Sequence, residues 1–548
     1  MQLHELEVEN YRAVRRARLS FGHTTVLIGE NDSGKSSLLE ALVRVLDGGA
    51  AEEPPNFESF QFHRDPVKHE IVGPIRIRIV FREREAGEWA GEVYAPIHDL
   101  LLRAGEDCRE VAFELRAQPE GEVVWRLKSG KRKTSDPEVL RWLREFTPAI
   151  HLRAGMLTGY GTETLPCAPG LCRTGETELD EKIAAIEVAA ERLISKTSPN
   201  QESDLEAGFK ATRELLQLVT LPRDRKAPNL ARRVREILGK GIDLNSSQPT
   251  LPGSNTSSEK LGILLLIAAL LRVARGAMAK EMEPIWIIED PEAHLHPKSL
   301  ASISYFLSDI RWQKIITTYS GAMVGSMPLS NVRRLTRRRG VVTEHRVDVT
   351  QLSGVELRRI GYHLGAHRGA ACFARMWLLV EGESEMWMLP QLARLCGYEF
   401  GVEGIECVEF AQSGLAPMIR VAEQLGIGWH VLADGDKAGQ TYIDTIRRTV
   451  ATKDRQGRFT LLNEPDIEHC FYKHGYAKVY QEHARLGGKS TRDMDPRRVI
   501  QRAVQTLSKP DLALRVIEAV AADGSPGVPD VLQKMIRTCV KVARSQSK

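Results

Sequence analysis

The fold of the first half of this chain is decided by residues 24–46, TTVLIGENDSGKSSLLEALVRVL. The stretch has the pattern of a short apolar strand, a turn with two glycines and a helix with apolar residues at helical spacing. Its turn, GENDSGKSS at residues 29–37, matches GxxxxGK[ST] in the strand-turn-helix context that this pattern requires. Glycines let the backbone N–H groups of such a turn wrap phosphates, and the helix N-terminus adds a favourable dipole. We therefore predict a phosphate-binding turn.

ATP is the expected ligand of this turn, together with Mg²⁺. Lys35 is expected to contact the β- and γ-phosphates and Ser36 to ligate the metal. The predicted nucleotide-binding residues of the turn are Gly29, Asn31, Gly34, Lys35, Ser36 and Ser37.

A second segment completes the predicted nucleotide site: the acidic PIWIIEDPEAHLHP at residues 284–297. Its apolar strand delivers two carboxylates at its C-terminal end. Glu289 is expected to hold Mg²⁺, directly or through water, and Asp290 to polarise the attacking water. His294 and His296 are better explained as part of the following loop than as metal ligands.

Composition limits the classes of protein to consider. A chain of 548 residues is too long for one hydrophobic core, so two or three domains are expected. No run of about 18 apolar residues is present and the N-terminal segment is charged, so we expect a cytoplasmic protein with no membrane partner. The net charge of +4 permits a polyanionic partner without arguing for one. Arg and Lys gather in residues 221–241 and 332–340, which favours nucleic-acid contact and a solvated basic face equally.

Periodicity divides the chain further. Residues 3–11 and 24–29 are predicted to form a strand pair, and the alternating IRIRIVFR (75–82) and GEVVWRLKSG (121–130) imply an antiparallel lobe. Helical spacing between about 178 and 245 predicts a helical insertion. We expect an α/β fold with a first domain at residues 1–350, a linker at 351–371 and a second domain at 372–548.

The second domain carries its own set of carboxylates. Glu381 and Glu385 lie at the end of the strand WLLVEGESE (377–385), and Asp434 and Asp436 lie at the end of HVLADGD (430–436). Acidic residues at the C-terminal ends of adjacent parallel strands converge at one edge of the sheet. Carboxylates that close repel one another unless divalent cations are present, so the cluster predicts a Mg²⁺ or Mn²⁺ site.

These motifs resemble those of known families. The GENDSGKSS and PIWIIED segments look like those of ABC-type ATPases of the SMC, RecF and OLD (overcoming lysogenization defect) group, over about residues 1–345. The glutamate-glycine strand end and the DGD segment resemble a Toprim domain over about residues 372–548. By this resemblance PDIEH (465–469) supplies Asp466 and Glu468 as metal ligands, and Lys509, with Lys489 as the fallback, is the basic residue that neutralises the scissile phosphate.

The chain departs from the ATPase pattern in three places. The signature loop is not LSGGQ, and its nearest candidate is LPGSNTSSEK at residues 251–260. The switch segment reads TTYSG, with Tyr319 where a histidine is usual, and Asp290 is shorter than the usual catalytic glutamate. These differences favour ATP binding over rapid ATP turnover.

The resemblance implies an OLD-type endonuclease or nickase that cuts DNA with divalent metal ions and is regulated by ATP. One ion would activate water and a second would stabilise the leaving 3′ oxygen, with Glu381 nearest the nucleophile. ATPase heads of this group bind nucleotide between two copies, so a homodimer is implied, as are phage defence and a defence or repair partner protein. The alternative is a RecF- or SMC-like DNA-binding repair ATPase without cutting activity. Topoisomerase or primase activity ranks lower, because no separate tyrosine-bearing domain or zinc module is apparent.

Overall fold

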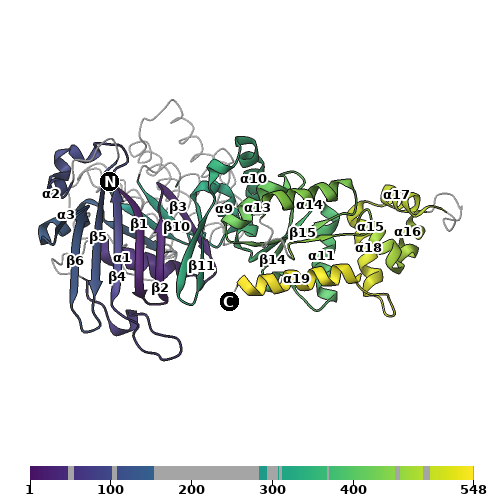
Figure 1. Ribbon diagram of the computed structural model, residues 1–548, viewed down its shortest axis with the longest axis horizontal. Helices are drawn as coiled ribbons and strands as arrows, with labels where there is room; N and C mark the ends of the chain where they lie inside the picture. The colour runs from purple at the N-terminus through teal and green to yellow at the C-terminus, as the bar shows by residue number, and fades with distance from the viewer. Residues whose placement is uncertain are drawn as a thin grey trace, which may run out of the picture. The chain divides into compact units, whose positions relative to one another are not determined.

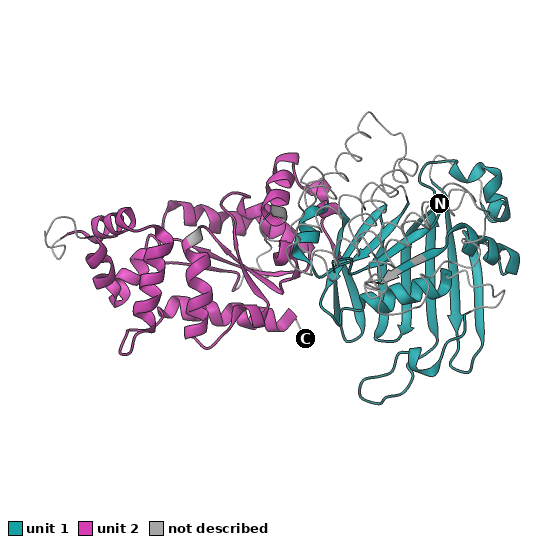
Figure 2. Ribbon diagram, turned by 180° about the vertical axis from the view of Figure 1, so that it is seen from behind, with its two compact units in different colours: residues 1–327, 331–344 teal, residues 328–330, 345–548 magenta. Residues whose placement is uncertain are grey.

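The protein divides into two compact units, shown in Figure 2. Unit 1 comprises residues 1–327 and 331–344, and unit 2 comprises residues 328–330 and 345–548. The computed structural model describes residues 1–46, 55–101, 108–153, 283–292, 307, 312–366, 369–450, 457–484 and 494–546. The predicted helical insertion, the basic stretch at 221–241, the candidate signature loop and residues His294, His296 and Lys489 lie outside these residues.

Unit 1 is built on one twelve-stranded sheet with the order β7-β6-β5-β4-β1-β2-β12-β11-β3-β10-β9-β8 (Figure 1). The strands are β1(Gln2–Tyr11), β2(Val14–Ser20), β3(Thr24–Gly29), β4(Ile75–Arg82), β5(Glu110–Ala117), β6(Val123–Ser129), β7(Arg132–Thr134), β8(Ala149–Arg153), β9(Ile285–Glu289), β10(Lys314–Thr317), β11(Val332–Arg338) and β12(Val341–Arg346). The α-helices of unit 1 among the described residues are α1(Lys35–Leu46), α2(Ala95–His98), α3(Pro137–Phe146) and α9(Gly321–Ser326).

The sheet has an antiparallel part and a parallel part. The predicted antiparallel lobe is confirmed, because β4 pairs with β5 and β5 with β6 in antiparallel register. In the parallel part β10 lies between β3 and β9 and pairs with both. The strand that enters the phosphate-binding turn and the strand that delivers Glu289 are therefore held one strand apart.

The predicted pairing of residues 3–11 with 24–29 is wrong. β1 pairs with β2 and β4, and β3 lies among the parallel strands. The missed strand β2, VRRARLS, has four polar residues in seven, because only alternate positions face the core. Asn10 and Arg12 adopt positive φ angles of 57° and 50°, so a tight turn returns the chain directly onto β1.

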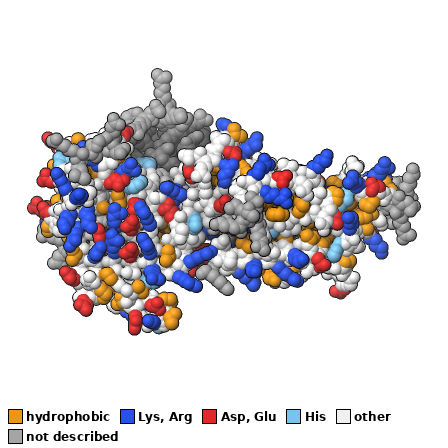
Figure 3. Space-filling view, in the orientation of Figure 1, with side chains coloured by type: hydrophobic (Ala, Val, Ile, Leu, Met, Phe, Trp, Pro, Cys, Tyr) orange, Lys and Arg blue, Asp and Glu red, His pale blue; other side chains and the backbone are white. Residues whose placement is uncertain are grey.

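The solvent-facing side of the antiparallel lobe carries a network of ion pairs. Arg18 reaches Glu5 at 2.7 Å, Arg78 reaches the same carboxylate at 3.3 Å, and Glu114 accepts from Lys128 at 2.6 Å. Figure 3 shows the resulting mixture of basic and acidic side chains on this face of unit 1. These arginines are largely neutralised within the sheet.

The basic stretch at residues 332–340 forms β11 and the turn after it. Arg333 and Arg334 are buried, and Arg333 Nε lies 3.2 Å from Glu344 Oε1. Burial removes these two side chains from any nucleic-acid surface, whereas Arg338 and Arg339 at the end of the stretch are exposed.

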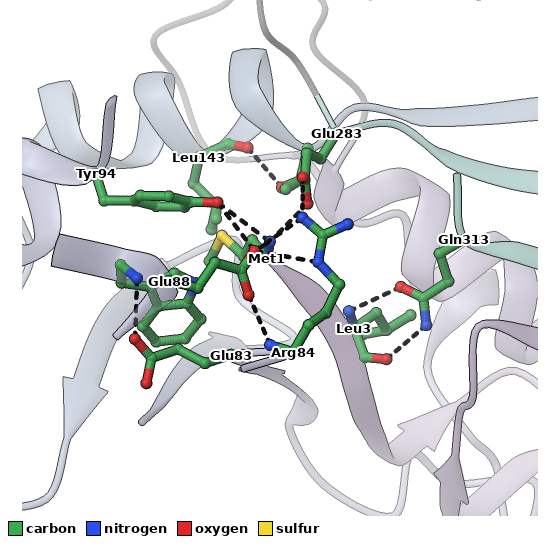
Figure 4. Close-up of polar contacts among 11 residues, drawn as sticks. Met1, Leu3, Glu83, Arg84, Glu88, Tyr94, Leu143, Glu283 and Gln313 are labelled. Atoms are coloured by element: carbon green, nitrogen blue, oxygen red, sulfur yellow. Dashed lines mark hydrogen bonds and ion pairs between the residues drawn. The ribbon is translucent and has the colours of Figure 1, made fainter. Parts of the chain in front are cut away.

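The starting ends of three strands are tied together by polar contacts, drawn in Figure 4. Gln313, the residue before β10, accepts from Leu3 N at 2.8 Å and donates to Leu3 O at 2.6 Å. Glu283, two residues before β9, pairs with Arg84, which also lies 2.8 Å from Glu88. The strands that carry the nucleotide-site carboxylates and the switch segment are thus anchored to β1 and β4.

Unit 2 is built on a four-stranded parallel sheet with the order β14-β13-β15-β16. The strands are β13(Met376–Val380), β14(Ile405–Glu409), β15(Gly428–Ala433) and β16(Phe459–Leu461). The α-helices among the described residues are α10(Gly354–Ala366), α11(Glu383–Leu395), α12(Phe400–Glu403), α13(Leu415–Gln424), α14(Lys437–Thr449), α15(Ile467–Phe471), α16(Ala477–His483), α17(Pro496–Thr506), α18(Lys509–Ala521) and α19(Asp530–Gln546). α19 packs on β13, β14 and β15, and α11 packs on α18.

The segment predicted as a linker, residues 351–371, is largely helical and belongs to unit 2. It contains α10, whose Ile360 and Leu364 are buried, and the chain divides after Glu344. Apolar residues at helical spacing give α10 a face that packs on its own unit.

Within the described part of the chain, no helix has the length and apolar character needed to cross a membrane.

Candidate active sites

The phosphate-binding turn requires its two glycines. Gly29 and Gly34 have φ angles of 149° and 94°, which L side chains rarely adopt. A Cβ at Gly29 would also lie 2.5 Å from Leu335 O on the neighbouring strand β11. Asn31 and Ser36 are exposed and Ser37 is half-buried, so these predicted ligand residues border an open surface of the turn.

Lys35 is buried at the start of α1. Its Nζ donates to Gly29 O at 2.7 Å, to Glu30 O at 2.9 Å and to Ser33 Oγ at 3.3 Å. Burial lowers the pKa of Lys35 to about 8, and the charge of Asp290 is the largest influence that opposes this shift. Lys35 and Asp290, predicted as parts of one site, are therefore within electrostatic reach of each other.

The carboxylates after β9 are held by neighbouring strands. Glu289 Oε1 lies 2.5 Å from Nε2 of His151 on β8. Asp290 has a φ angle of 48°; its N donates to Thr317 O at 3.1 Å, and its Oδ1 accepts from Thr317 Oγ1 at 3.0 Å. Burial, together with the charge of Glu289, raises the pKa of the Asp290 carboxyl.

Three contacts at this site were not predicted. Glu292 accepts from the switch segment, with Tyr319 N at 2.6 Å and Thr318 Oγ1 at 2.7 Å. Arg337, at the end of β11, lies 3.3 Å from Asp32 of the turn. His151 contacts Glu289 from a strand 138 residues away in sequence. Glu292 and Arg337 lie in the acidic and basic segments that sequence analysis selected, residues 284–297 and 332–340, whereas His151 gave no local signal.

The parallel sheet of unit 2 places its acidic residues along one edge. Glu381 follows β13 and Asp434 follows β15, and these two strands are paired. Burial and, after it, the charges of Glu385, Glu381, Asp466 and Glu468 together raise the pKa of Asp434 to about 8. The predicted carboxylates therefore converge, and their mutual repulsion is strong.

Lys509, at the start of α18, reaches the same cluster. Its Nζ lies 3.9 Å from Glu468 Oε1, and its side chain is 62% exposed. Burial raises the pKa of Glu385 and of Glu468, and the positive charge of Lys509 opposes both shifts. The described structure thus brings the predicted Lys509 to these carboxylates.

Asp436 and Asp466 have a local structural role as well. Asp436 caps α14 by accepting from Gly439 N at 2.8 Å, and Asp466 caps α15 by accepting from His469 N at 2.7 Å. His469 Nδ1 lies 2.6 Å from the same Asp466 oxygen. N-capping fixes the direction of each carboxylate.

Glycines bring the backbone close to these acids. A Cβ at Gly439 would lie 1.8 Å from Asp434 O, and one at Gly435 would lie 2.4 Å from Glu464 O. No side chain fits either position without movement of the backbone. The DGDKAG segment therefore needs both glycines to place Asp434.

The residues fit a hard divalent cation in their chemistry. All the predicted ligands are carboxylate oxygens, and Glu381 Oε2 is buried with no hydrogen-bond partner among the described residues. No three or more His, Cys, Asp or Glu side chains in the described ranges are already arranged around one metal position. Mg²⁺ commonly takes only one or two carboxylates and keeps several waters, so a preformed cage is not required.

Sequence analysis did not predict Tyr442 and His469. Tyr442, on α14, hydrogen-bonds to Glu381 and contacts Phe410 edge to face at 4.9 Å. His469 directly follows Glu468 in a segment that was selected, so its proximity was a usable signal. Tyr442 had no such signal, because its contact with Glu381 depends on how α14 packs.

Comparison with known proteins also divides the chain in two, but between residues 371 and 372, whereas the compact units divide after Glu344. Residues 1–371 match a family described as "Protein of unknown function (DUF2813)", and residues 372–436 match "Overcoming lysogenization defect protein-like, TOPRIM domain". The chain is 31% identical to "Uncharacterized protein YbjD" of Escherichia coli (strain K12), with both chains covered completely. It is 24% identical to "OLD nuclease" of Thermus scotoductus, over 79% of this chain and 82% of that protein.

Among solved structures, the SMC head domain from Thermotoga maritima overlaps with a TM-score of 0.33 at 16% identity, covering 64% of this chain and all of that one. The C-terminal region of the Burkholderia pseudomallei OLD protein overlaps with a TM-score of 0.27 at 16% identity, covering 32% of this chain and all of that one. The fold is α/β, with a unit built on a twelve-stranded mixed sheet followed by a Toprim domain with a parallel sheet. The chain belongs to the DUF2813 family and carries an OLD-like Toprim domain, which confirms the resemblance to OLD proteins that its motifs indicated.

Proposed function

We propose that this protein is an ATP-binding DNA endonuclease or nickase whose Toprim domain cuts phosphodiester bonds with Mg²⁺ or Mn²⁺. The observation that carries the proposal is the burial of Asp434 among four other carboxylates at the edge of a parallel sheet. Such a cluster is electrostatically unfavourable by itself and becomes favourable around divalent cations. The matches to an OLD-like Toprim domain and to a protein named OLD nuclease support the same reaction.

The residues of the cluster have distinct proposed roles. Glu381, Glu385, Asp434, Asp436, Asp466 and Glu468 would hold the cations, which would supply an activated water and stabilise the leaving 3′ oxygen. Glu381, hydrogen-bonded by Tyr442, is our candidate for the carboxylate nearest the attacking water. Lys509, whose ammonium group is largely exposed beside Glu468, would neutralise charge on the scissile phosphate.

ATP would regulate cutting and would not serve as its chemical fuel. Lys35, Ser36 and Glu289 would bind MgATP, and Asp290 would polarise the attacking water. ATP would favour one arrangement of two ATPase heads in a homodimer. The short Asp290 side chain and Tyr319 in the switch segment suggest slow hydrolysis. A role in phage defence or DNA repair, with a partner protein, is part of the proposal.

The test is cleavage of supercoiled plasmid with Mg²⁺ or Mn²⁺, each with and without ATP. Wild type is expected to nick or linearise the plasmid, while Glu381→Ala and Asp434→Ala are expected to leave it intact. Asp444→Ala is the matched control, because Asp444 is an exposed carboxylate on α14 paired with Arg447. Cutting that survives both site substitutions would contradict the proposed site. DNA binding and ATP binding without any cutting would instead favour a RecF-like repair ATPase.

A further inference from the structure

The ammonium group of Lys35 has a complete set of hydrogen-bond partners within unit 1. Its acceptors are Gly29 O, Glu30 O and Ser33 Oγ, at 2.7, 2.9 and 3.3 Å. A lysine ammonium has three N–H groups, so none is left for a phosphate oxygen. A polyphosphate can be bound only if Lys35 gives up at least one of these acceptors.

The ring of Tyr319 lies over the same ammonium. Lys35 Nζ is 4.4 Å from the ring centroid, within the range of a cation–π contact. Lys35 is only 3% exposed, whereas Tyr319 is 45% exposed. One side of the ring therefore meets solvent while the ammonium beneath it is shielded, and a phosphate approaching Lys35 from solvent meets Tyr319.

Glu292 fixes the backbone that carries this ring. Its Oε1 accepts from Tyr319 N at 2.6 Å, from Thr318 Oγ1 at 2.7 Å and from Ser320 N at 3.2 Å. Three donors on one carboxylate oxygen hold the segment tightly, since hydrogen bonds to an ionised acceptor are the strong ones. Tyr319 is therefore held over Lys35 by a carboxylate that follows β9, from the opposite half of the site.

We propose that Tyr319 competes with polyphosphate for Lys35: its ring covers the ammonium group, a bound triphosphate must displace it, and Glu292 holds the ring in its covering position. The competition with triphosphate rests on the proposed nucleotide site. That the Tyr319 ring covers Lys35 can be tested without nucleotide. Displacement of the ring would pull on residues 318–320 and so link phosphate binding to the carboxylates after β9.

The first experiment measures acylation of Lys35 by a water-soluble amine reagent in the full-length protein, with peptide mass spectrometry. Lys473, which is 68% exposed, is the internal reference. Tyr319→Ala and Glu292→Ala should raise the labelling rate of Lys35 relative to Lys473 several-fold. Tyr319→Phe keeps the aromatic face and should label as wild type does. Equal labelling of Lys35 in wild type and Tyr319→Ala would overturn the inference.

The second experiment measures equilibrium binding of MgATP and of inorganic tripolyphosphate to the same variants. A desolvated cation–π contact of about 0.5 to 2 kcal/mol corresponds to about a 2- to 30-fold change in Kd. Tyr319→Ala should bind both ligands tighter by a factor in that range, and Tyr319→Phe should restore wild-type affinity.

The two proposals fail in different ways. If wild type binds ATP and Lys35→Ala does not, the nucleotide site stands, and unchanged or weaker binding by Tyr319→Ala overturns competition alone. If wild type and Tyr319→Ala both fail to bind either ligand, the nucleotide site itself is wrong and competition falls with it. Tighter binding of ATP but not of tripolyphosphate would overturn competition for phosphate as well.

Discussion

The deeply buried histidine of β15 gives the Toprim domain a defined acid sensitivity. His430, on β15, is 2% exposed, and its ring nitrogens lie 2.9 Å from Gly457 O and 2.9 Å from Thr460 Oγ1. Burial lowers the pKa of His430 to about 4, so the folded protein keeps the ring neutral while the unfolded chain binds a proton below about pH 6.5. The free energy of unfolding should therefore fall as the pH drops from about 6.5 to about 4, by about 3 kcal/mol from this residue.

Urea unfolding at pH 7, 5.5 and 4 checks this expectation by comparing wild type with His430→Gln. The variant should be less stable at pH 7 but should lose less stability between pH 7 and pH 4. Parallel pH profiles for the two proteins would show that His430 does not carry the acid sensitivity.

The glycine after the DGD segment is expected to be irreplaceable. Because a Cβ at Gly439 would lie 1.8 Å from Asp434 O, Gly439→Ala must move the backbone that holds Asp434. We expect a loss of about 3 kcal/mol or more in the free energy of unfolding. Gly401→Ala in α12 is the control, since a Cβ there meets nothing within 4 Å and its effect should stay within about 1 kcal/mol. Equal melting temperatures for the two variants would contradict this reading of the loop.

At the scale of elements, the stability of the antiparallel lobe should depend most on the carboxylate that has the largest number of ion pairs. Glu114, on β5, accepts from Lys128 at 2.6 Å, Arg116 at 2.9 Å and Arg76 at 3.3 Å, and its side chain is 8% exposed. Glu114→Gln leaves these three cations without their shared carboxylate and should cost about 1 to 3 kcal/mol.

The matched control lies on the same strand. Glu110 is 50% exposed and has an ion pair with Arg82 at 3.7 Å, so Glu110→Gln should change stability by less than about 0.5 kcal/mol. Chemical denaturation followed by tryptophan fluorescence compares the two variants. Equal losses would indicate that shared pairing adds nothing to a single exposed pair.

The elements that sequence analysis found are those marked by residues that lie close together in the sequence. The turn before α1 and the ends of β13 and β15 were predicted, because glycines and carboxylates at fixed spacing mark them. β14, IECVE, was not predicted, because a short strand with two exposed or half-buried acids lacks a clear apolar run. The contact between His151 and Glu289 could not be predicted either, since it depends on β8 pairing with β9 across a long interval of sequence.

For the whole molecule, each unit has its own hydrophobic core, and the two sets of core residues do not overlap. The units should therefore respond separately to mutation. In calorimetry of the full-length protein, Glu114→Gln should lower one unfolding transition and Gly439→Ala the other. A single transition lowered by both substitutions would show that the units unfold as one.

The placement of α10 in unit 2 gives the sharpest test of where that unit begins. Residues 345–371 are bound to α13: Arg420 donates to Gln351 O at 2.7 Å, Asp348 N donates to Gln424 Oε1 at 2.9 Å, and Glu356 lies 3.7 Å from Arg420. A fragment of residues 345–548 should therefore unfold cooperatively, whereas one of residues 372–548 loses these contacts and the buried side chains of α10. We expect the shorter fragment to be less stable by several kcal/mol, since two buried aliphatic side chains alone contribute about 3 to 6 kcal/mol. Thermal unfolding of both fragments in one buffer tests this: equal stability would make residues 351–371 the linker that was predicted from the sequence, and a large difference would make them part of the folded second unit.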